Sequence, residues 1–231
     1  MNKPQQQSIH DVSTDQRPDD ALRITEIFKS LQGESRTVGL PTVFIRLTGC
    51  PLRCQYCDTS YAFTGGEWMS IPQILDAVKN YQTKWVTVTG GEPLAQKNCL
   101  RLLTLLCDAG YEVSLETSGA LPVENVDARV IKVMDLKTPG SGEENRNLMQ
   151  NIQYLQAKDQ VKFVICNEPD YQWAKKIIET YGLLQKCEVL MSPSYTQLSA
   201  RQLADWILHD GLAVRFQLQL HKILWGDEPG R

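Results

Sequence analysis

The chain has 231 residues, with 24 Lys and Arg against 27 Asp and Glu, which gives a formal charge of −3. This length suits one large domain or a tight pair, and 42% hydrophobic residues are enough for a buried core. A slightly acidic chain has no basic field for direct nucleic-acid binding, and it contains no apolar run of about 20 residues that would span a membrane. The N-terminus lacks the apolar region of a secretory signal, so we expect a cytoplasmic protein with reduced thiols.

Residues 1–21 are polar and contain the run Gln5–Gln7, with few apolar anchors. This composition predicts a disordered leader, because such a segment buries too little surface to offset the entropy of ordering. The remaining residues, 22–231, are expected to form one domain.

Within that domain, short β-branched runs alternate with amphipathic stretches. The expected strands are 42–47, 85–89, 112–116, 130–136, 161–166, 187–191 and 213–220. The expected helices are 70–80, 94–108, 143–156, 171–181 and 199–209, with Ser70 and Ser199 as N-caps. Alternating strands and helices predict a parallel sheet, and seven strands in roughly 200 residues predict an α/β fold of the partial, trimmed TIM-barrel type. The connection from 116 to 130 is too short for a standard crossover helix, so one helix should be missing or vestigial.

Seven cysteines are present, and three of them, Cys50, Cys54 and Cys57, fall within eight residues. This segment directly follows an expected strand, so it lies at the edge where barrel folds build their sites. A tetrahedral zinc site needs a fourth ligand, which the neighbouring sequence does not supply. A [4Fe–4S] cluster held by three cysteines leaves one iron open. A zinc loop completed by a remote ligand is the alternative. The other four cysteines, Cys99, Cys107, Cys166 and Cys187, are expected in the core.

A second motif, Thr89-Gly90-Gly91-Glu92-Pro93, ends the next strand. Paired glycines allow close approach of the backbone to a ligand, and Glu92 is able to accept hydrogen bonds from an ammonium group. The same residues also suit a simple strand-to-helix turn.

The spacing CxxxCxxC, with Tyr56 before the last cysteine, resembles the radical S-adenosylmethionine (SAM) superfamily. The resemblance implies that SAM chelates the open iron and is cleaved by an electron from the cluster into methionine and a 5′-deoxyadenosyl radical. Glycine-rich residues 90–92 are similar to the superfamily's stretch that holds the SAM amino group.

Further segments narrow the resemblance: residues 26–34, Cys57-Asp58-Thr59, 116–119, 135–142, 192–193 and 219–222. Together they resemble the 7-carboxy-7-deazaguanine synthase family over about residues 22–225. That resemblance implies a carbon–nitrogen lyase that converts 6-carboxy-5,6,7,8-tetrahydropterin into 7-carboxy-7-deazaguanine with loss of ammonia, in the 7-deazapurine (queuosine) pathway of tRNA modification. It also implies Mg²⁺, a flavodoxin or ferredoxin as electron donor, and a homodimer.

The resemblance carries roles onto particular residues. Those implied to bind SAM are Tyr56, Cys57, Asp58, Gly91, Glu92, Asp135, Leu136, Lys137 and Ser192. Those implied to bind the pterin are Leu31, Gln32, Gly33, Arg46, Thr89 and Glu116. Arg46 suits two-point recognition of the substrate carboxylate. Thr59 is the implied Mg²⁺ ligand, and His221, expected at the end of the last strand, is a candidate for proton transfer or a structural histidine.

Two other functions fit part of these observations. One is a different radical SAM enzyme, such as a glycyl-radical enzyme activase, although the chain lacks the extra cysteine motifs that such proteins often carry. The other is a non-enzymatic zinc or iron–sulfur regulatory module.

Overall fold

The computed structural model describes residues 18–226, 228 and 230. Most of the predicted leader therefore lies outside the described residues. Its last residues do not: the amide of Ala21 donates to the carbonyl of Pro18 at 2.9 Å, and the side chain of Asn98 donates to the carbonyl of Asp19 at 2.9 Å. Ala21 also opens the first strand, so residues 18–21, which were assigned to the leader, make ordered contacts with the domain.

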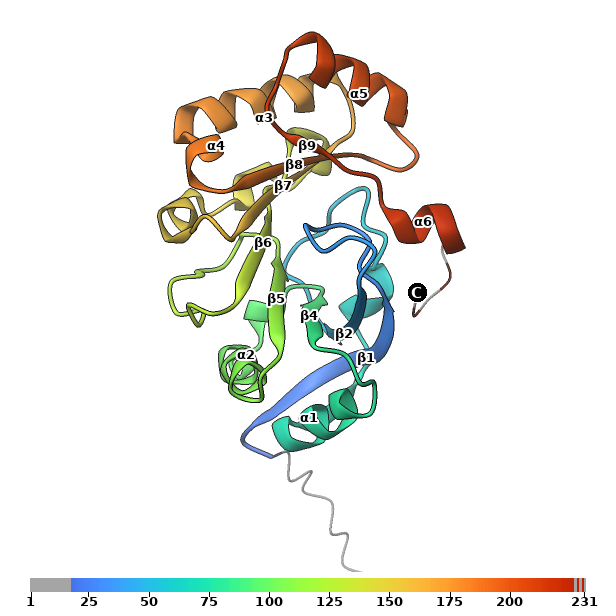
Figure 1. Ribbon diagram of the computed structural model, residues 1–231, viewed down its shortest axis with the longest axis vertical. Coiled ribbons are helices and arrows are strands. Elements are labelled where there is room, and N and C mark those ends of the chain that lie inside the picture. Colours follow the sequence, from blue (N-terminus) through green and yellow to red (C-terminus); the bar gives the residue numbers. More distant parts are fainter. Residues whose placement is uncertain (1–17, 227, 229, 231) are drawn as a thin grey trace, which may run out of the picture.

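The described residues form a nine-stranded sheet in the order β3-β1-β2-β4-β5-β6-β7-β8-β9, curled into an open partial barrel (Figure 1). Its strands are β1 (Ala21–Leu31), β2 (Pro41–Leu47), β3 (Glu67–Ser70), β4 (Trp85–Gly90), β5 (Glu112–Thr117), β6 (Ile131–Asp135), β7 (Gln160–Ile165), β8 (Glu188–Pro193) and β9 (Arg215–Phe216). The predicted strands correspond to β2 and β4–β9, which are mutually parallel. The predicted partial barrel is confirmed.

Two antiparallel strands, β1 and β3, were not predicted. The pairing of β1 with β2 shifts register between Ile24 and Glu26. Such an irregularity interrupts the alternation of apolar and polar residues by which a strand is recognised. β3 has only four residues and no fully buried one, so it carries no such alternation either.

The α-helices are α1 (Ile71–Lys79), α2 (Cys99–Asp108), α3 (Glu168–Tyr181), α4 (Leu183–Lys186), α5 (Ala200–His209) and α6 (Leu220–Trp225). Ser70 caps α1 with a reciprocal bond to Gln73, and Ser199 caps α5, as predicted. α3 ends at Gly182 with φ of +58°, a conformation that glycine adopts without strain. As expected, no α-helix lies between β5 and β6 in this described segment.

The predicted helix over 143–156 is wrong. Two short 3₁₀ turns stand there, Glu144–Arg146 and Met149–Tyr154. The side chain of Asn147 bonds both the amide and the carbonyl of Lys137, at 2.9 and 2.8 Å. The side chain of Asn151 bonds backbone groups of residues 119, 121 and 123. These long-range contacts fix the segment against neighbouring loops and outweigh its local helical preference.

The predicted strand over 213–220 is also largely wrong, because only Arg215–Phe216 pairs with β8. The chain then crosses toward the segment after β1, where the amide of Leu220 donates to the carbonyl of Gly33 at 3.1 Å. His221 and Lys222 therefore belong to α6 and not to a strand end.

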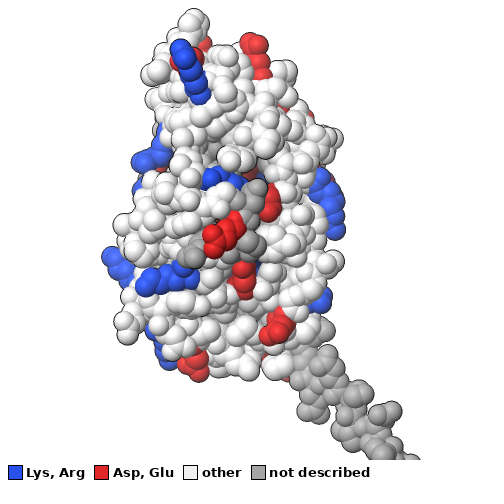
Figure 2. Space-filling model, turned by 90° about the vertical axis from the view of Figure 1, so that its right-hand side faces the viewer, with Lys and Arg blue, Asp and Glu red and all other residues white. Residues whose placement is uncertain are grey.

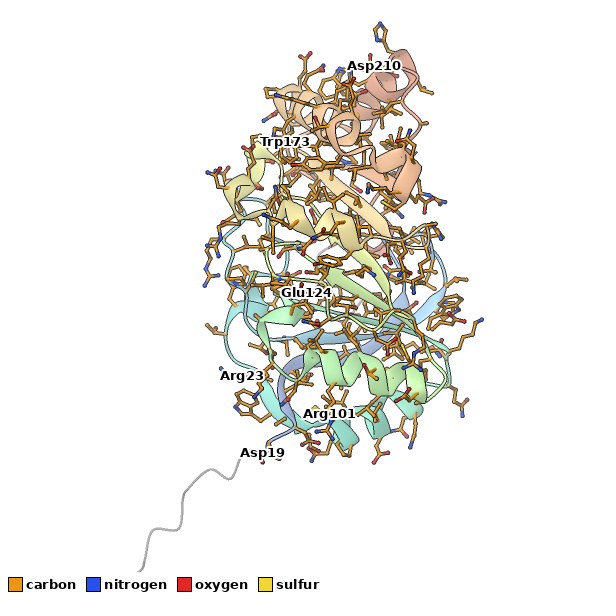
Figure 3. The ribbon with its side chains drawn as sticks, turned by 90° about the vertical axis from the view of Figure 1, so that its left-hand side faces the viewer. Asp19, Arg23, Arg101, Glu124, Trp173 and Asp210 are labelled. Carbon is orange, nitrogen blue, oxygen red and sulfur yellow. The ribbon has the colours of Figure 1, made fainter. Side chains whose placement is uncertain are left out.

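The core lies between the sheet and its outer helices. Figure 3 faces these helices, with Arg101 of α2 and Trp173 of α3 labelled. Cys99, Cys166 and Cys187 are buried, and Cys107 is partly buried against the core, as predicted. No helix in the described part of the chain has the length and apolar content to span a membrane.

Candidate active site

The carboxyl ends of the parallel strands open into a cavity of about 580 Å³. Figure 2 faces the side with α6 and shows acidic and basic side chains close together near the middle of this face. The cavity is lined by sixteen predicted site residues: Leu31, Gln32, Gly33, Arg46, Cys50, Cys54, Tyr56, Cys57, Asp58, Thr59, Thr89, Gly91, Glu116, Asp135, Lys137 and His221. Glu92, Leu136 and Ser192 are not among the lining residues. Sixteen of the nineteen candidate residues therefore line one cavity.

The cysteine loop follows β2 and holds three half-buried thiols at the cavity. Burial raises the pKa of each thiol, that of Cys54 to about 11. A thiol must lose its proton to bind iron, so assembly of a cluster on this loop would release protons. The other four cysteines are packed in or against the core, so among the described residues no fourth cysteine joins this set. The donor set fits a [4Fe–4S] cluster with one iron open to SAM.

Gly91 packs directly under the cysteine loop. Its amide donates to Leu47 at 3.1 Å, and the next amide donates to Gly49 at 2.8 Å. A Cβ at position 91 would lie 2.8 Å from the Cβ of Cys50, 2.6 Å from the carbonyl carbon of Gly49, and closer still to its oxygen. Glycine is required at this position because any side chain would displace the loop.

The predicted contact of Glu92 with the SAM ammonium needs correction. Glu92 is 0% exposed, and its carboxylate accepts hydrogen bonds from the amide of Leu94 and from Thr117 Oγ1. It also accepts from the amide and the hydroxyl of Ser118, at 2.7 and 2.5 Å. Glu92 therefore ties the end of β4 to the end of β5 behind the cavity wall.

Leu136 and Ser192 are likewise buried away from the cavity lining. Leu136 belongs to the core cluster beneath β6. The Ser192 hydroxyl is buried and has no hydrogen-bond partner among the described residues. Neither position supports the predicted direct contact with SAM.

Tyr56, Asp135 and Lys137 meet at one part of the cavity lining. Lys137 Nζ lies 3.1 Å from Asp135 Oδ2 and 5.7 Å from the centre of the Tyr56 ring. The Tyr56 hydroxyl and Asp135 Oδ1 are both buried without a hydrogen-bond partner in the described part of the chain. Unpaired buried polar atoms are costly, so their presence at the cavity points to a polar ligand. The set fits SAM.

Glu116, which also lines the cavity, is held by two neutral donors. Thr89 Oγ1 donates to it at 2.9 Å, and Gln32 Nε2 donates at 3.2 Å. Burial and the nearby carboxylate of Glu34 raise the pKa of Glu116. The group is available to accept or share hydrogen bonds with an amine-bearing ligand.

Arg46, on β2, faces the cavity beside Phe28 and Tyr61. Its Nε donates to Glu26 Oε1 at 2.7 Å, and the Tyr61 hydroxyl donates to the same oxygen at 2.8 Å. Glu26 thus fixes the guanidinium through Nε, which leaves the two terminal nitrogens as a fork for a ligand carboxylate.

Thr59 lies at the mouth of the cavity and donates to Asp58 Oδ1 at 2.8 Å. Ligand atoms of Asp58, Glu34 and His221 lie within 4.8 Å of one another. The Asp58 carboxylate and the Thr59 hydroxyl supply oxygen ligands of the kind that Mg²⁺ prefers.

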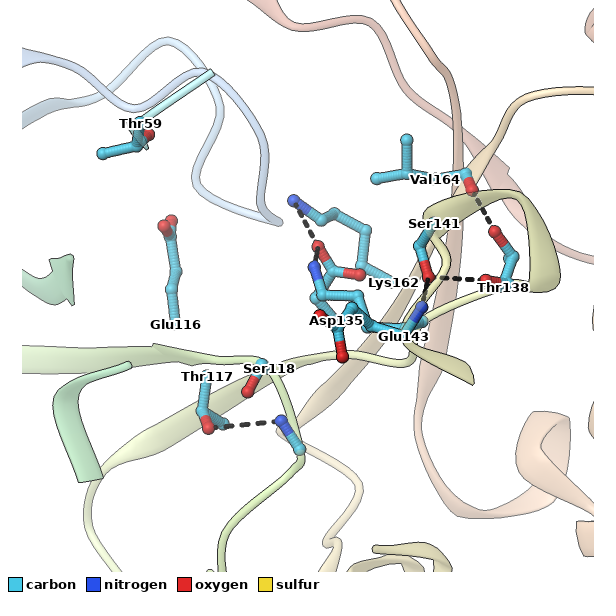
Figure 4. Close-up of polar contacts among 12 residues, drawn as sticks. Thr59, Glu116, Thr117, Ser118, Asp135, Thr138, Ser141, Glu143, Lys162 and Val164 are labelled. Atoms are coloured by element: carbon cyan, nitrogen blue, oxygen red, sulfur yellow. Dashed lines mark hydrogen bonds and ion pairs between the residues drawn. The ribbon is translucent and has the colours of Figure 1, made fainter. Parts of the chain in front are cut away.

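Two charged residues of the cavity, Glu34 and Lys162, were not predicted. Burial would raise the pKa of Glu34, but Lys162 and His221 outweigh it and lower that pKa to about 2. Lys162, on β7, contacts Glu34 and lies 3.4 Å from Asp135, as the close-up in Figure 4 shows for Lys162 and Asp135. Lys162 interrupts the otherwise apolar run 161–166, and this was the available signal, because a buried cation requires partners.

An open α/β barrel with three cysteines at the carboxyl end of β2 defines a radical SAM enzyme. The model of the Radical SAM superfamily matches residues 44–182. Members of this class use a [4Fe–4S] cluster and SAM, so this chain does too. Its fold is also that of QueE from Escherichia coli, with a TM-score of 0.72 at 23% identity over 87% of this chain and 95% of that one.

Curated relatives specify the family. The chain is 45% identical to 7-carboxy-7-deazaguanine synthase of Chlorobaculum tepidum, over 90% of this chain and 96% of that protein. It is 39% identical to the synthase of Koribacter versatilis, over 90% and 98%, and 37% identical to that of Thermoplasma acidophilum, over 90% and 100%. The chain belongs to the 7-carboxy-7-deazaguanine synthase family.

Proposed function

We propose that this enzyme converts 6-carboxy-5,6,7,8-tetrahydropterin into 7-carboxy-7-deazaguanine with loss of ammonia. The observation that carries the proposal is a single cavity that joins the cysteine loop to an arginine fork and a ring of hydrogen-bonding side chains. The proposal is supported by relatives named 7-carboxy-7-deazaguanine synthase that match about 90% of the chain.

The chain's own residues divide the work. Cys50, Cys54 and Cys57 hold the cluster, and Asp135 with Lys137 orients SAM. When bound, the cluster and SAM supply the radical chemistry that removes a hydrogen atom from the pterin. Arg46 binds the substrate carboxylate, while the Gln32–Glu116 side holds the nitrogen-rich edge of the pterin. The enclosing strands exclude water from the reacting groups.

Anaerobic incubation of the reconstituted enzyme with the pterin, SAM and a reductant tests the function. We expect 7-carboxy-7-deazaguanine and ammonia, with SAM regenerated. Absence of this product would refute the proposal. Radical formation on an added partner protein would favour an activase, whereas stoichiometric zinc without iron would favour a regulatory module.

Arg46→Lys is expected to weaken pterin binding specifically. Lysine keeps the charge but loses the two-point geometry. Loss of one charged hydrogen bond costs about 1.5–3 kcal/mol, so KM for the pterin should rise on the order of 10- to 100-fold. Steady-state kinetics measure this effect. Arg36→Lys is the matched control, because Arg36 also binds a glutamate through Nε, at 2.9 Å, but on the surface. Equal KM values for the two variants would contradict the assignment.

Thr59→Val is expected to weaken activation by Mg²⁺. Valine has the shape of threonine and lacks its oxygen, so a contact worth about 1.4 kcal/mol should be lost, on the order of tenfold in the Mg²⁺ concentration required. The measurement is product formation against Mg²⁺ concentration, with the exposed Thr64→Val as control. An unchanged Mg²⁺ dependence would remove Thr59 from the metal site.

His221 is proposed to transfer protons during ammonia loss, since its ring lies against Gly33 and lines the cavity.

We further propose a flavodoxin or ferredoxin as reductant, a cytoplasmic location, where thiols stay reduced, and a homodimer. Light scattering of the purified protein tests the last point, for which a monomer mass would be the contrary result.

A further inference from the structure

Lys162 joins the two halves of the cavity. Its Nζ contacts Glu34 Oε2 and lies 3.4 Å from Asp135 Oδ2. The same Asp135 oxygen lies 3.1 Å from Lys137 Nζ. Glu34 follows Gln32 and Gly33 on the proposed pterin side, whereas Asp135 and Lys137 form the proposed SAM side. An alternating chain of four charges therefore runs from one half-site to the other.

These charges interact strongly because water screens them poorly. The four side chains are between 12% and 17% exposed. Burial would lower the pKa of Lys162, but Glu34, Asp135 and Glu116 raise it well above the ordinary value for lysine. Lys162 is therefore a permanent cation that three carboxylates attract.

The contacts of this cation are unequal. Lys162 is closer to Glu34 than to Asp135, and Glu34 accepts a further hydrogen bond from Gln219 at 2.5 Å. Asp135, by contrast, retains a buried oxygen, Oδ1, without a hydrogen-bond partner among the described residues. A ligand that donates N–H groups to Glu34 would compete with Lys162 for that carboxylate. The ammonium would then favour Asp135, the less satisfied of the two.

A shift of Lys162 toward Asp135 has a consequence for Lys137. Lys162 would replace Lys137 as the counter-ion of Asp135, and the Lys137 ammonium would become available to a ligand carboxylate. SAM carries such a carboxylate in its methionine part.

We propose that Lys162 is a positioning residue through which binding of an N–H-donating heterocycle at Glu34 strengthens binding of the carboxylate-bearing cofactor at Lys137. The inference rests on the proposed function for the identity of the two ligands. Because binding free energies are linked, SAM must strengthen pterin binding by the same factor.

The test is the affinity of the reconstituted enzyme for SAM with and without the pterin. Calorimetry under anaerobic conditions without reductant measures binding alone, since SAM is not cleaved. For the unmodified enzyme we expect the pterin to tighten SAM binding by about fivefold or more, within the usual range of coupling between sites. A ratio near one would overturn the proposal.

Two variants locate the effect. Lys162→Met keeps the chain length and removes the charge, so the ratio should fall to about one. Glu34→Gln releases Lys162 from its nearer partner, so SAM should bind without pterin about as tightly as it binds the unmodified enzyme with pterin. Lys132→Met is the matched control, because Lys132 pairs with Asp159 at 2.9 Å in a still more deeply buried position outside the cavity.

The control variant distinguishes a loss of coupling between the two ligands from a mere loss of stability. The coupling ratio is the affinity for SAM with pterin divided by the affinity without it. If Lys132→Met lowers stability but keeps this ratio, while Lys162→Met loses it, the proposed coupling through Lys162 is supported. The proposed coupling is wrong if Lys162→Met keeps the ratio. It is also wrong if Glu34→Gln binds SAM only as tightly as the unmodified enzyme does without pterin. Product formation by the unmodified enzyme is measured separately. If product forms but the two ligands do not affect each other's binding, only the proposed coupling through Lys162 is refuted. If no product forms, the proposed function is refuted.

Discussion

Replacing Cys54 by alanine is expected to abolish SAM cleavage while leaving the fold intact. Cys54 is one of three thiols that hold the cluster, and two thiolates do not retain it in a form with one defined open iron. The residue is half-buried in a surface loop and outside both core clusters, so its removal leaves little cavity in the core. We expect 5′-deoxyadenosine formation to fall below detection.

Cys107→Ala is the control for that variant. Cys107 is also partly buried, but it packs on α2 against the core and does not line the cavity. Iron content and SAM cleavage should therefore remain normal, with only a modest loss of stability. SAM cleavage that persists in Cys54→Ala would show that the cluster ligands are assigned wrongly.

Gly91→Ala is expected to have the next largest effect. The added Cβ would lie within 2.8 Å of Cys50 and 2.6 Å of the Gly49 backbone, which have no flexible side-chain end to move aside. Overpacking of this kind costs on the order of 3 kcal/mol, and its relief displaces the loop that carries the cysteines. We expect reduced iron loading and a lower melting temperature.

The control for Gly91→Ala is Gly110→Ala. Gly110 has φ of +86°, and a Cβ there meets nothing within 4 Å. This substitution therefore imposes backbone strain without contact with the cysteine loop, so stability should fall while iron loading is kept. Equal iron loading in the two variants would contradict the role assigned to Gly91.

The sequence was sufficient for six of the seven parallel strands, and it supplied sixteen of the residues that line the cavity. Apolar runs such as that of Val189, Leu190 and Met191 in β8 report burial directly. Residues at the carboxyl ends of parallel strands converge at one edge without further information. The short spacing of Cys50, Cys54 and Cys57 made the metal site a local property of one loop. Ser70 and Ser199 likewise acted through neighbours only three residues away.

The errors lie where distant segments decide the outcome. Asn147 and Asn151 hold their segment in 3₁₀ turns by bonding other loops. Residues 217–220 leave the sheet because they meet the segment after β1. Both effects depend on partners far away in the chain.

By itself, the sequence determined the class of enzyme, its cofactor loop and the edge of the sheet that carries the site, because these depend on local spacing and periodicity. Only the tertiary structure decided the direction of each side chain. The Glu92 carboxylate points behind the cavity wall, where it bonds Ser118. His221 lies on a helix against Gly33, and Lys162 lies between Glu34 and Asp135. Glu34 and Lys162 are 128 residues apart, and their pairing arises from the close approach of β7 and the segment after β1, which no local pattern encodes.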